Sequence, residues 1–491
     1  MKKYILIILC CLTSFPLWSY NVNMIVEHYS VDQGLPNNTV NCTLKDRDGF
    51  IWFGTWYGLC CFDGVKFKTF NKQEHDSDVP PRKIQRIVED KNGYIWVKTI
   101  DRKLYVFNKV TECFHAVYDD MKNYSENIQV IKLQNTAEGD VLLLTKDKNL
   151  LLAGVDEKGQ VTIKILFDSR DEINKHDYTL KHHVLCETEE YISWIGTDYK
   201  VSAVHKGAEL ASRPADFITS KINSGDKDSF TSFFEDGRKV WVGDRAGIFY
   251  SIDVRTGLVN RYVLSEIKGA ISNLLVTPAG YVYLSVTGQG TYEYDLAERR
   301  LQKINTEMND AMVTHAFIDQ YDKIWFHENE KALIYYDPLN HTAKRFPFTM
   351  FGKITTLYSE DAGERGLFFL SPAGEAWLFD REHAEMVYIN KLKQLSNDRA
   401  NQQFYHLMLD NDGVLWLSSA DEGVYCMNFP KKQFNLLSLS PQSAGQENYT
   451  TGVRALFQSK SGDIWVGTRW QSVYRMDRNG VTKHVFSTGD E

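Results

Sequence analysis

Apolar positions recur along the chain in short runs that end at a polar pair and restart after a turn. The segment DGFIWFGT (residues 48–55) is the fullest example. Nine further segments resemble it, and the aromatic or apolar residues at the equivalent position are Trp52, Trp96, Leu143, Trp194, Trp241, Tyr283, Trp325, Phe369, Trp416 and Trp465. Successive positions lie 42 to 51 residues apart. A β-propeller blade has this period, about 40 to 50 residues.

Each copy divides at its turn residues into four short strands. In the fullest copy the pattern predicts strands over residues 39–44, 50–54, 58–62 and 65–70. Asp-Gly pairs at 48–49 and 63–64 are strong hairpin signals, because both turn positions favour positive φ. The middle strands are apolar throughout, whereas the fourth alternates, as expected for a blade whose outer strand has one solvent-facing side.

We therefore predict an all-β fold: a seven-bladed β-propeller followed by the first blades of a second, incomplete propeller. Propellers have roughly four to eight blades, so ten copies exceed one ring. The expected divisions are a signal peptide over 1–20, the seven-bladed propeller over 21–349 and about three further blades over 350–491. A parallel β-solenoid is the alternative, but its repeats are shorter.

The leading strand over 24–30 has no assigned blade at this point. It should complete a blade as an outer strand, yet the seventh copy has its own outer-strand candidate over 342–348. The alternative is that the leading strand belongs to the last blade of the second ring. The sequence leaves this open.

The N-terminus predicts export. Lys2 and Lys3 precede an apolar stretch that is too short to cross a membrane and is followed by small and polar residues, as in a secretory signal peptide. Lipid attachment at Cys10 or Cys11 is disfavoured, because Leu9 is not the small residue that such a site requires.

Cysteine placement and net charge narrow the function classes. Cys42 and Cys60 fall on the first and third strands of one copy, about 9–10 Å apart, which is beyond disulfide reach. We expect both to be buried thiols. The net charge of −8 argues against nucleic acid or an anionic membrane surface as the partner.

The repeat unit resembles the two-component regulator propeller repeat. The residues that carry the resemblance are TVNCTLKDRDGFIWFGTWYGLCCFDG from residue 39 and GVRALFQSKSGDIWVGTRWQSVYRMD from residue 452, and the opening EHYSVDQGLPNNTV (27–40) is similar to the start of such sensor regions. The family occurs in the periplasmic sensor region of hybrid two-component system sensor histidine kinases that control polysaccharide use.

The resemblance implies a periplasmic, non-catalytic sensor that recognises an oligosaccharide. Family members carry two seven-bladed propellers, a β-sandwich, a membrane helix and kinase domains, so the chain is expected to be a fragment or truncated product without kinase output. We expect no enzyme activity, no cofactor and no nucleic-acid partner. A homodimer stays open, and a membrane would be reached only through the missing C-terminal segments.

The turns after the tryptophan strands are the candidate ligand contacts. Aromatic rings cover the apolar face of a sugar, while Arg, Lys, Asn and Gln bind its hydroxyl or acidic groups. The candidates are Trp56, Tyr57, Arg102, Tyr199, Lys200, Arg245, Gln289, Asn329, Arg469 and Trp470.

Two other function classes remain as alternatives. A propeller-type lyase or lactonase would need catalytic carboxylates, for which the sequence offers Glu328, Glu330 and Glu422. A protein-binding scaffold would need no small ligand. No metal site is expected: the segment DRDG (46–49) fits a hairpin turn better than a calcium loop, and the pair at 182–183, His-His, lacks further ligands.

Overall fold

The structure is a computed structural model, and almost every element in it is a β-strand. It describes residues 25–70, 81–122, 129–146, 149–167, 185–187, 190–195, 201–206, 215–216, 230–304, 313–328, 331–351, 358–361, 366–371, 374–391, 404–428, 452–469, 472–477 and 482–487. The chain divides into two units, Met1–Phe429 and Pro430–Glu491. None of the described helices is long and apolar enough to span a membrane. The predicted signal peptide lies outside the described residues.

The strands form four-stranded antiparallel sheets that follow one another along the chain. The first five sheets are β2 (Val40–Lys45), β3 (Ile51–Thr55), β4 (Gly58–Phe62) and β5 (Phe67–Phe70); β6 (Ile84–Glu89), β7 (Ile95–Thr99), β8 (Leu104–Asn108) and β9 (Cys113–Ala116); β10 (Val130–Asn135), β11 (Val141–Thr145), β12 (Leu150–Val155) and β13 (Val161–Phe167); β14 (Leu185–Glu187), β15 (Tyr191–Ile195), β16 (Val201–His205) and β17 (Ala215–Asp216); and β18 (Phe230–Glu235), β19 (Lys239–Asp244), β20 (Ile248–Asp253) and β21 (Val259–Val263).

The remaining sheets continue the series. They are β22 (Ile271–Val276), β23 (Tyr281–Val286), β24 (Gly290–Asp295) and β25 (Arg300–Lys303); β26 (Val313–Ile318), β27 (Ile324–Glu328), β28 (Ala332–Asp337) and β29 (Thr342–Pro347); β30 (Tyr358–Asp361), β31 (Leu367–Leu370), β32 (Glu375–Asp380) and β33 (Glu385–Lys391); β34 (Phe404–Leu409), β35 (Val414–Ser419) and β36 (Val424–Asn428) with β1 (Ile25–Tyr29); and β37 (Val453–Gln458), β38 (Ile464–Thr468), β39 (Ser472–Met476) and β40 (Thr482–Ser487). The short helices are η1 (Val31–Gln33), α2 (Tyr118–Met121) and η3 (Phe348–Phe351).

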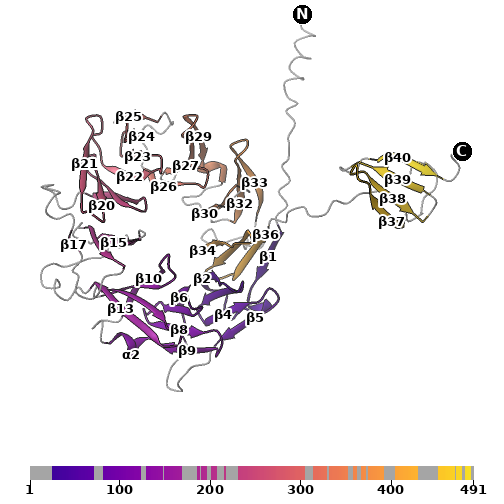
Figure 1. Ribbon diagram of the computed structural model, residues 1–491, viewed down its shortest axis with the longest axis horizontal. Helices are drawn as coiled ribbons and strands as arrows, with labels where there is room; N and C mark the ends of the chain where they lie inside the picture. Colours follow the sequence, from indigo (N-terminus) through magenta and orange to yellow (C-terminus); the bar gives the residue numbers. More distant parts are fainter. Residues whose placement is uncertain are drawn as a thin grey trace, which may run out of the picture. The chain divides into compact units, whose positions relative to one another are not determined.

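The first nine sheets form a β-propeller ring within the first unit. Figure 1 shows the first strand of these sheets, here called the inner strand, toward the middle of the ring and the fourth toward its rim. Apolar clusters join each sheet to the next around the series. A further cluster joins the ninth sheet to the first, because Trp416 packs against Phe53, with ring centroids 5.9 Å apart.

Strand β1 closes the ring. It pairs antiparallel with β36, so the N-terminal strand is the fourth strand of the ninth sheet, with Glu27 opposite Cys426. His28 stacks on Tyr425 with ring centroids 4.5 Å apart. Strand β29 is the outer strand of the seventh sheet, which confirms the prediction for residues 342–348. The open question about the leading strand is thereby answered in favour of a sheet within this chain.

The all-β propeller class is confirmed, but the count of seven blades is not. Among the described residues nine sheets lie in the first unit, and the division falls at residues 429 and 430, whereas we predicted a boundary between residues 349 and 350. The physical reason is continued packing: Trp325 in the seventh sheet contacts Phe369 and Phe379 in the eighth at 5.3 and 4.6 Å between ring centroids. The described sheets therefore continue to pack across the predicted boundary.

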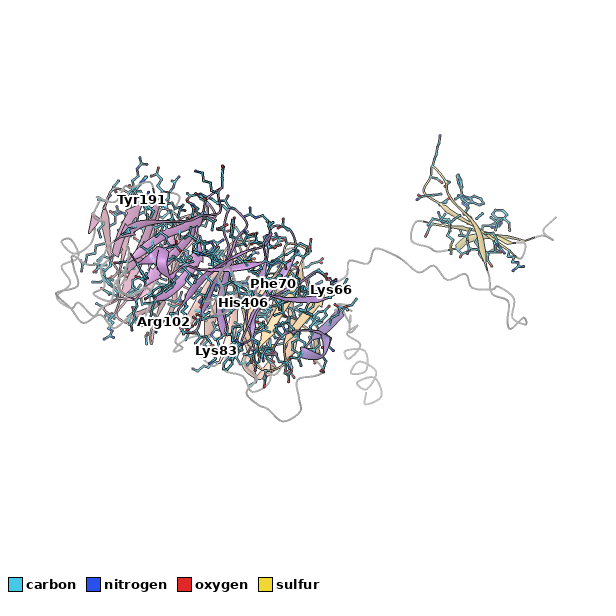
Figure 2. The ribbon with its side chains drawn as sticks, turned by 90° about the horizontal axis from the view of Figure 1, so that it is seen from below. Lys66, Phe70, Lys83, Arg102, Tyr191 and His406 are labelled. Atoms are coloured by element: carbon cyan, nitrogen blue, oxygen red, sulfur yellow. The ribbon has the colours of Figure 1, made fainter. Side chains whose placement is uncertain are left out.

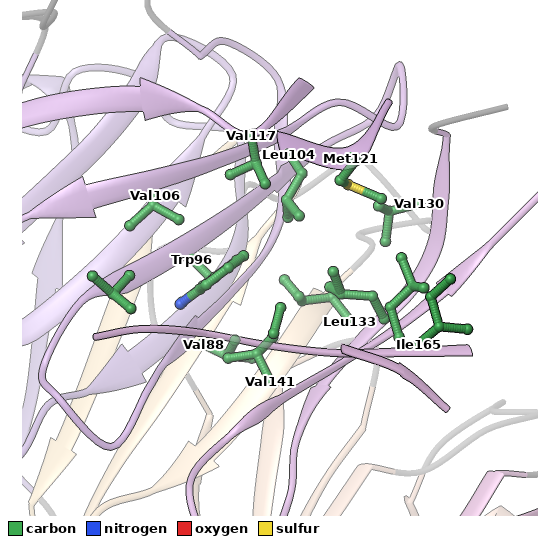
Figure 3. Packing of buried hydrophobic residues seen from close by; sticks show 14 residues of the cluster. Val88, Trp96, Leu104, Val106, Val117, Met121, Val130, Leu133, Val141 and Ile165 are labelled. Atoms are coloured by element: carbon green, nitrogen blue, oxygen red, sulfur yellow. The ribbon is translucent and has the colours of Figure 1, made fainter. Parts of the chain in front are cut away.

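The tryptophan position forms the contact between neighbouring sheets, as the repeat predicts. Figure 3 shows the cluster between the second and third sheets, where Trp96 lies among Val88, Leu133 and Val141. Trp96 is fully buried. Burial of an aromatic ring at each junction stabilises sheets that could not bury both faces alone.

An aspartate lies six residues before most of these tryptophans, and its bond to the indole was not predicted from the sequence. In the second sheet Asp90 Oδ2 accepts a hydrogen bond from Trp96 Nε1 at 2.8 Å, while Oδ1 accepts from the backbone N–H groups of Asn92 and Tyr94. One carboxylate therefore holds both the hairpin turn and the buried indole. The same Asp–Trp bond occurs as Asp46–Trp52 (2.8 Å), Asp236–Trp241 (2.7 Å, five residues apart), Asp319–Trp325 (3.3 Å) and Asp410–Trp416 (3.1 Å).

The aspartate gives way to threonine in two sheets that lack the indole. Thr136 precedes Leu143 and Thr277 precedes Tyr283, and each threonine hydroxyl accepts a hydrogen bond from a turn amide. In these two sheets the hydroxyl accepts only the hydrogen bond from the turn amide, because the position of the tryptophan holds a leucine or a tyrosine. In the second unit Ser459 takes this position.

The closure at β1 gives a first testable prediction. Gly423 and Gly49 both have positive φ, at 89° and 91°, but a Cβ at Gly423 would overlap the backbone oxygen of Tyr29 in β1, whereas nothing lies within 4 Å of a Cβ at Gly49. We expect Gly49→Ala to cost about 1 kcal/mol and Gly423→Ala about 2 kcal/mol or more. Thermal unfolding of both variants measures the difference. Equal losses would contradict the closure by β1.

The cysteine prediction is confirmed. Cys42 and Cys60 are buried and free. Burial raises the pKa of the Cys42 thiol to about 12, although the nearby guanidinium of Arg86 opposes the shift. Both residues pack as small apolar side chains.

Candidate ligand-binding site

The turns between second and third strands place two of the predicted aromatic contacts in solvent. Trp56 and Tyr57 lie between β3 and β4, and their exposed fractions are 44% and 62%. Thr55 holds this turn, since its hydroxyl accepts a hydrogen bond from the Tyr57 N–H at 3.2 Å and donates one to the Gly58 oxygen at 2.8 Å. The turn therefore presents two aromatic rings on a fixed backbone.

Backbone hydrogen bonds connect this turn to the next sheet. The Lys83 N–H donates to the Trp56 oxygen, and the Ile100 N–H donates to the Lys83 oxygen, both at 2.9 Å. The Lys83 ammonium lies 5.3 Å from the centroid of the Trp56 ring, at cation–π distance. Arg102 follows two residues after Ile100. The structure thus brings Trp56, Tyr57 and Arg102 into one row and adds Lys83.

The row continues into the third sheet. Arg102 is exposed and has a φ of 67°. Its Nη1 donates to Gln129 Oε1 at 3.2 Å, and its carbonyl accepts from the Val130 N–H at 3.1 Å. The Gln129 carbonyl in turn accepts from the Lys146 N–H. Figure 2 shows Lys83 and Arg102 along one margin of the first unit and Tyr191 at the opposite margin.

We call this row the basic face. It consists of Trp56, Tyr57, Arg82, Lys83, Arg102 and Lys146. Among the described residues of these turns Asp101 is acidic, and it pairs with Lys103 at 3.4 Å. Arg82 and Lys83 lie in the connector that precedes the inner strand β6. Only the turns after the tryptophans were considered in the sequence, so these two residues were not named.

The other predicted residues do not join this face. Arg245 is exposed in the turn after β19, further round the ring. Gln289 uses its side-chain amide structurally: Oε1 accepts from the Lys268 N–H at 2.7 Å, and Nε2 donates to the Glu266 oxygen at 3.0 Å. Arg469 lies in the second unit.

Four predicted residues lie outside the described residues, namely Tyr199, Lys200, Asn329 and Trp470. Their roles as ligand contacts stay predictions.

The carboxylates considered for catalysis are engaged where the structure describes them. Glu328 is buried and accepts two hydrogen bonds from the Arg345 guanidinium, at 3.1 and 2.9 Å. Glu422 accepts a hydrogen bond from the Tyr425 hydroxyl at 2.6 Å. Glu330 lies outside the described residues. Neither described carboxylate is placed as an accessible general base.

Three carboxylates gather around the first hairpin turn, but a lysine occupies their centre. The ammonium of Lys109 lies 3.1 Å from Asp46, 2.6 Å from Asp48 and 2.8 Å from Glu89. Burial alone would lower the pKa of Lys109, yet its hydrogen bonds to the carboxylates raise the pKa overall. Asp46 also accepts from the Phe50 N–H. The hairpin interpretation of DRDG is confirmed, and Lys109 supplies the cation.

Two titratable side chains, one in β7 and one in the inner strand β34, have lowered pKa values. Burial, followed by the charge of Arg102, lowers the pKa of Lys98 to about 8. Burial, followed by the charge of Arg86, lowers the pKa of His406 to about 4. The His406 imidazole is therefore neutral at pH 7. Neither residue was singled out in the sequence.

Comparison with known proteins supports the repeat assignment. Residues 34–57 match the family model described as two component regulator propeller, which confirms the resemblance for the segment that ends at Trp56 and Tyr57. No curated protein matches the chain.

Three matching solved structures share low sequence identity with the chain. One is described as the extracellular domain of a hybrid two component system, BT3049, from B. thetaiotaomicron, with 15% identity, a TM-score of 0.33 and coverage of 95% of this chain and 67% of that one. A second, the extracellular domain of BT4673 from the same organism, has 18% identity, a TM-score of 0.30 and coverage of 93% and 61%. A third, streptogramin B lyase, has 10% identity, a TM-score of 0.36 and coverage of 84% and 99%. The chain thus spans less than two thirds of the BT4673 domain.

Proposed function

We propose, because residues 34–57 carry a two component regulator propeller repeat, that the chain is an exported ligand-sensing module of a two-component signalling system. The ligand is an oligosaccharide, and it binds on the basic face. The observation that carries the proposal is the exposure of Trp56 and Tyr57, two adjacent rings held on a rigid turn within the matched repeat.

The chemistry of the basic face suits a sugar. A pyranose presents an apolar face of C–H groups, which an aromatic ring covers, and a rim of hydroxyls, which Lys83 and Arg102 can bind. Trp and Tyr supply large contact area at low cost in conformational entropy. A sensor only needs one of its two conformational states to bind the ligand more tightly than the other. A difference of a few kcal/mol in binding free energy is enough to shift the population between these states.

Calorimetric titration of the chain with a panel of oligosaccharides tests the proposal. We expect saturable binding of one glycan class without product formation, and Trp56→Ala should weaken that binding about tenfold, which corresponds to ~1.4 kcal/mol. Phe50→Ala is the matched control, because Phe50 lies in the same sheet at the opposite turn with a similar exposed fraction, 43% against 44%.

Three outcomes would overturn the proposal. Turnover of the bound sugar or of a lactone would indicate a lyase or lactonase instead. Equal binding by the Trp56→Ala and Phe50→Ala variants would place the ligand elsewhere. Binding of proteins without any glycan would indicate a scaffold.

A further inference from the structure

We propose that the ligand carries an acidic group, a carboxylate or a sulfate ester, and that Arg86 binds this group at the inner strand of the second sheet. This inference rests on the proposed function, because it names the chemical class of the oligosaccharide.

Two cationic residues are paired between the first and second strands of the second sheet. Arg86 in β6 and Lys98 in β7 are directly paired in the strand register. Lys98 has an exposed fraction of only 6%, and its ammonium donates to Gln85 Oε1 at 2.5 Å. Among the described residues neither Arg86 nor Lys98 forms an ion pair with a carboxylate. The charge that acts on buried Lys98 is that of Arg102, so an anion bound here would offset positive charge that no described carboxylate compensates.

The ninth sheet contributes an unsatisfied polar atom to the same region. His406 Nδ1 in β34 is buried and has no hydrogen-bond partner among the described residues. Arg86 lies close enough to His406 for its charge to act on the imidazole, and it acts on Cys42 in the intervening sheet as well. The inner strands β2 and β34 contact each other. Arg86 and His406 therefore belong to one cluster that spans three sheets.

The same position of three other inner strands holds a lysine or a histidine. In four sheets the pairing between the inner strand and the second strand shifts register after the first residue of the inner strand, and regular pairing resumes two residues later. The later residue is Arg86, Lys132, His315 or His406. In three further sheets of the first unit with this shift the residue is Cys42, Ser232 or Asn273. Among these described strands the position holds no acidic residue, although the whole chain has a net charge of −8.

The cluster continues into the basic face. Arg86 follows Lys83 by three residues, and Lys83 lies against the Trp56 ring. Lys98 lies near the charge of Arg102. A ligand stacked on Trp56 would thus have its acidic group within the positive field of Arg86 and Lys98. A guanidinium binds a carboxylate or sulfate with two parallel hydrogen bonds, which suits Arg86, whereas buried Lys98 contributes charge.

Titration of the chain with matched saccharide pairs tests the inference. One pair is a uronic-acid oligomer and its carboxyl-reduced counterpart, and the other is a sulfated oligomer and its desulfated counterpart. We expect an acidic member to bind at least tenfold more tightly than its neutral counterpart, and Arg86→Gln to abolish that difference. Arg238→Gln is the matched control, because Arg238 is an exposed arginine in the first turn of the fifth sheet, and it should leave binding unchanged.

The ligand-free chain provides a second readout. Lys98→Met removes the buried positive charge while it preserves an apolar side chain of similar length, so its midpoint of thermal unfolding should equal or exceed that of the unaltered chain. A lowered midpoint would show that Lys98 serves the fold, and would overturn the inference.

The remaining outcomes separate the inference from the proposed function. Equal binding of acidic and neutral sugars, unaffected by Arg86→Gln, would overturn the acidic ligand and leave an oligosaccharide sensor. Binding of inorganic sulfate alone, lost in Arg86→Gln, would overturn the sugar and with it the proposed function.

Discussion

Trp325→Ala is expected to lower the free energy of unfolding of the first unit by about 3–5 kcal/mol. The Trp325 side chain is 0% exposed, and it lies at the junction of the seventh and eighth sheets. Its ring centroid is 4.6 Å from that of Phe379 and 5.3 Å from that of Phe369 in the next sheet. Truncation removes a large buried area and leaves a cavity that β-sheet backbones cannot close.

Urea denaturation followed by circular dichroism measures this loss. Trp325→Phe keeps a ring at the junction and should cost less than the alanine variant. Trp465→Ala changes a half-buried tryptophan in the second unit, so it should leave the main transition of the first unit in place. A loss below about 1 kcal/mol for Trp325→Ala would mean that the two sheets do not pack through this ring.

Asp90→Ala is expected to cost about 3 kcal/mol, although it changes no apolar residue. The Asp90 carboxylate is 1% exposed. Its removal leaves the Trp96 indole N–H without the acceptor that lies at 2.8 Å, and it also releases the turn amides of Asn92 and Tyr94. A buried donor without a partner costs its full desolvation energy.

A double-mutant cycle separates the indole bond from the turn. Trp96→Phe removes the N–H, so Asp90→Ala should cost less in that background, by about 1–2 kcal/mol. Asp156 provides the control: it accepts the turn amides of Lys158 and Gln160, and no bond between its carboxylate and a tryptophan is described. Asp156→Ala should cost about 1 kcal/mol. Additive losses in the cycle would show that the aspartate acts on the turn alone.

The repeat was predictable because local chemistry sets it. Turn residues, apolar middle strands and the tryptophan position lie close together in one copy, so the pattern over residues 39–70 was enough to infer a four-stranded sheet. The aspartate six residues before the tryptophan was visible too, but its second role was not. Only the folded hairpin brings Oδ2 of Asp46 to the indole of Trp52.

The ring size and the candidate site were not predictable in the same way. Each sheet presents similar apolar faces to both neighbours, so the sequence does not limit how many sheets pack before the ring closes. The basic face likewise combines a turn of one sheet with the connector to the next. Trp56 and Arg102 were named from the sequence, whereas Lys83 joins them only through backbone bonds between the sheets.

The blade, its four strands, its buried ring and the free thiols Cys42 and Cys60 followed from the sequence alone, because each depends on residues close together in one copy. Only the assembled ring places β1 in the ninth sheet and Arg86 near His406. These pairs join the two ends of the ring. Their proximity depends on the angles between successive sheets. These angles add up over many interfaces, and no single repeat encodes their sum.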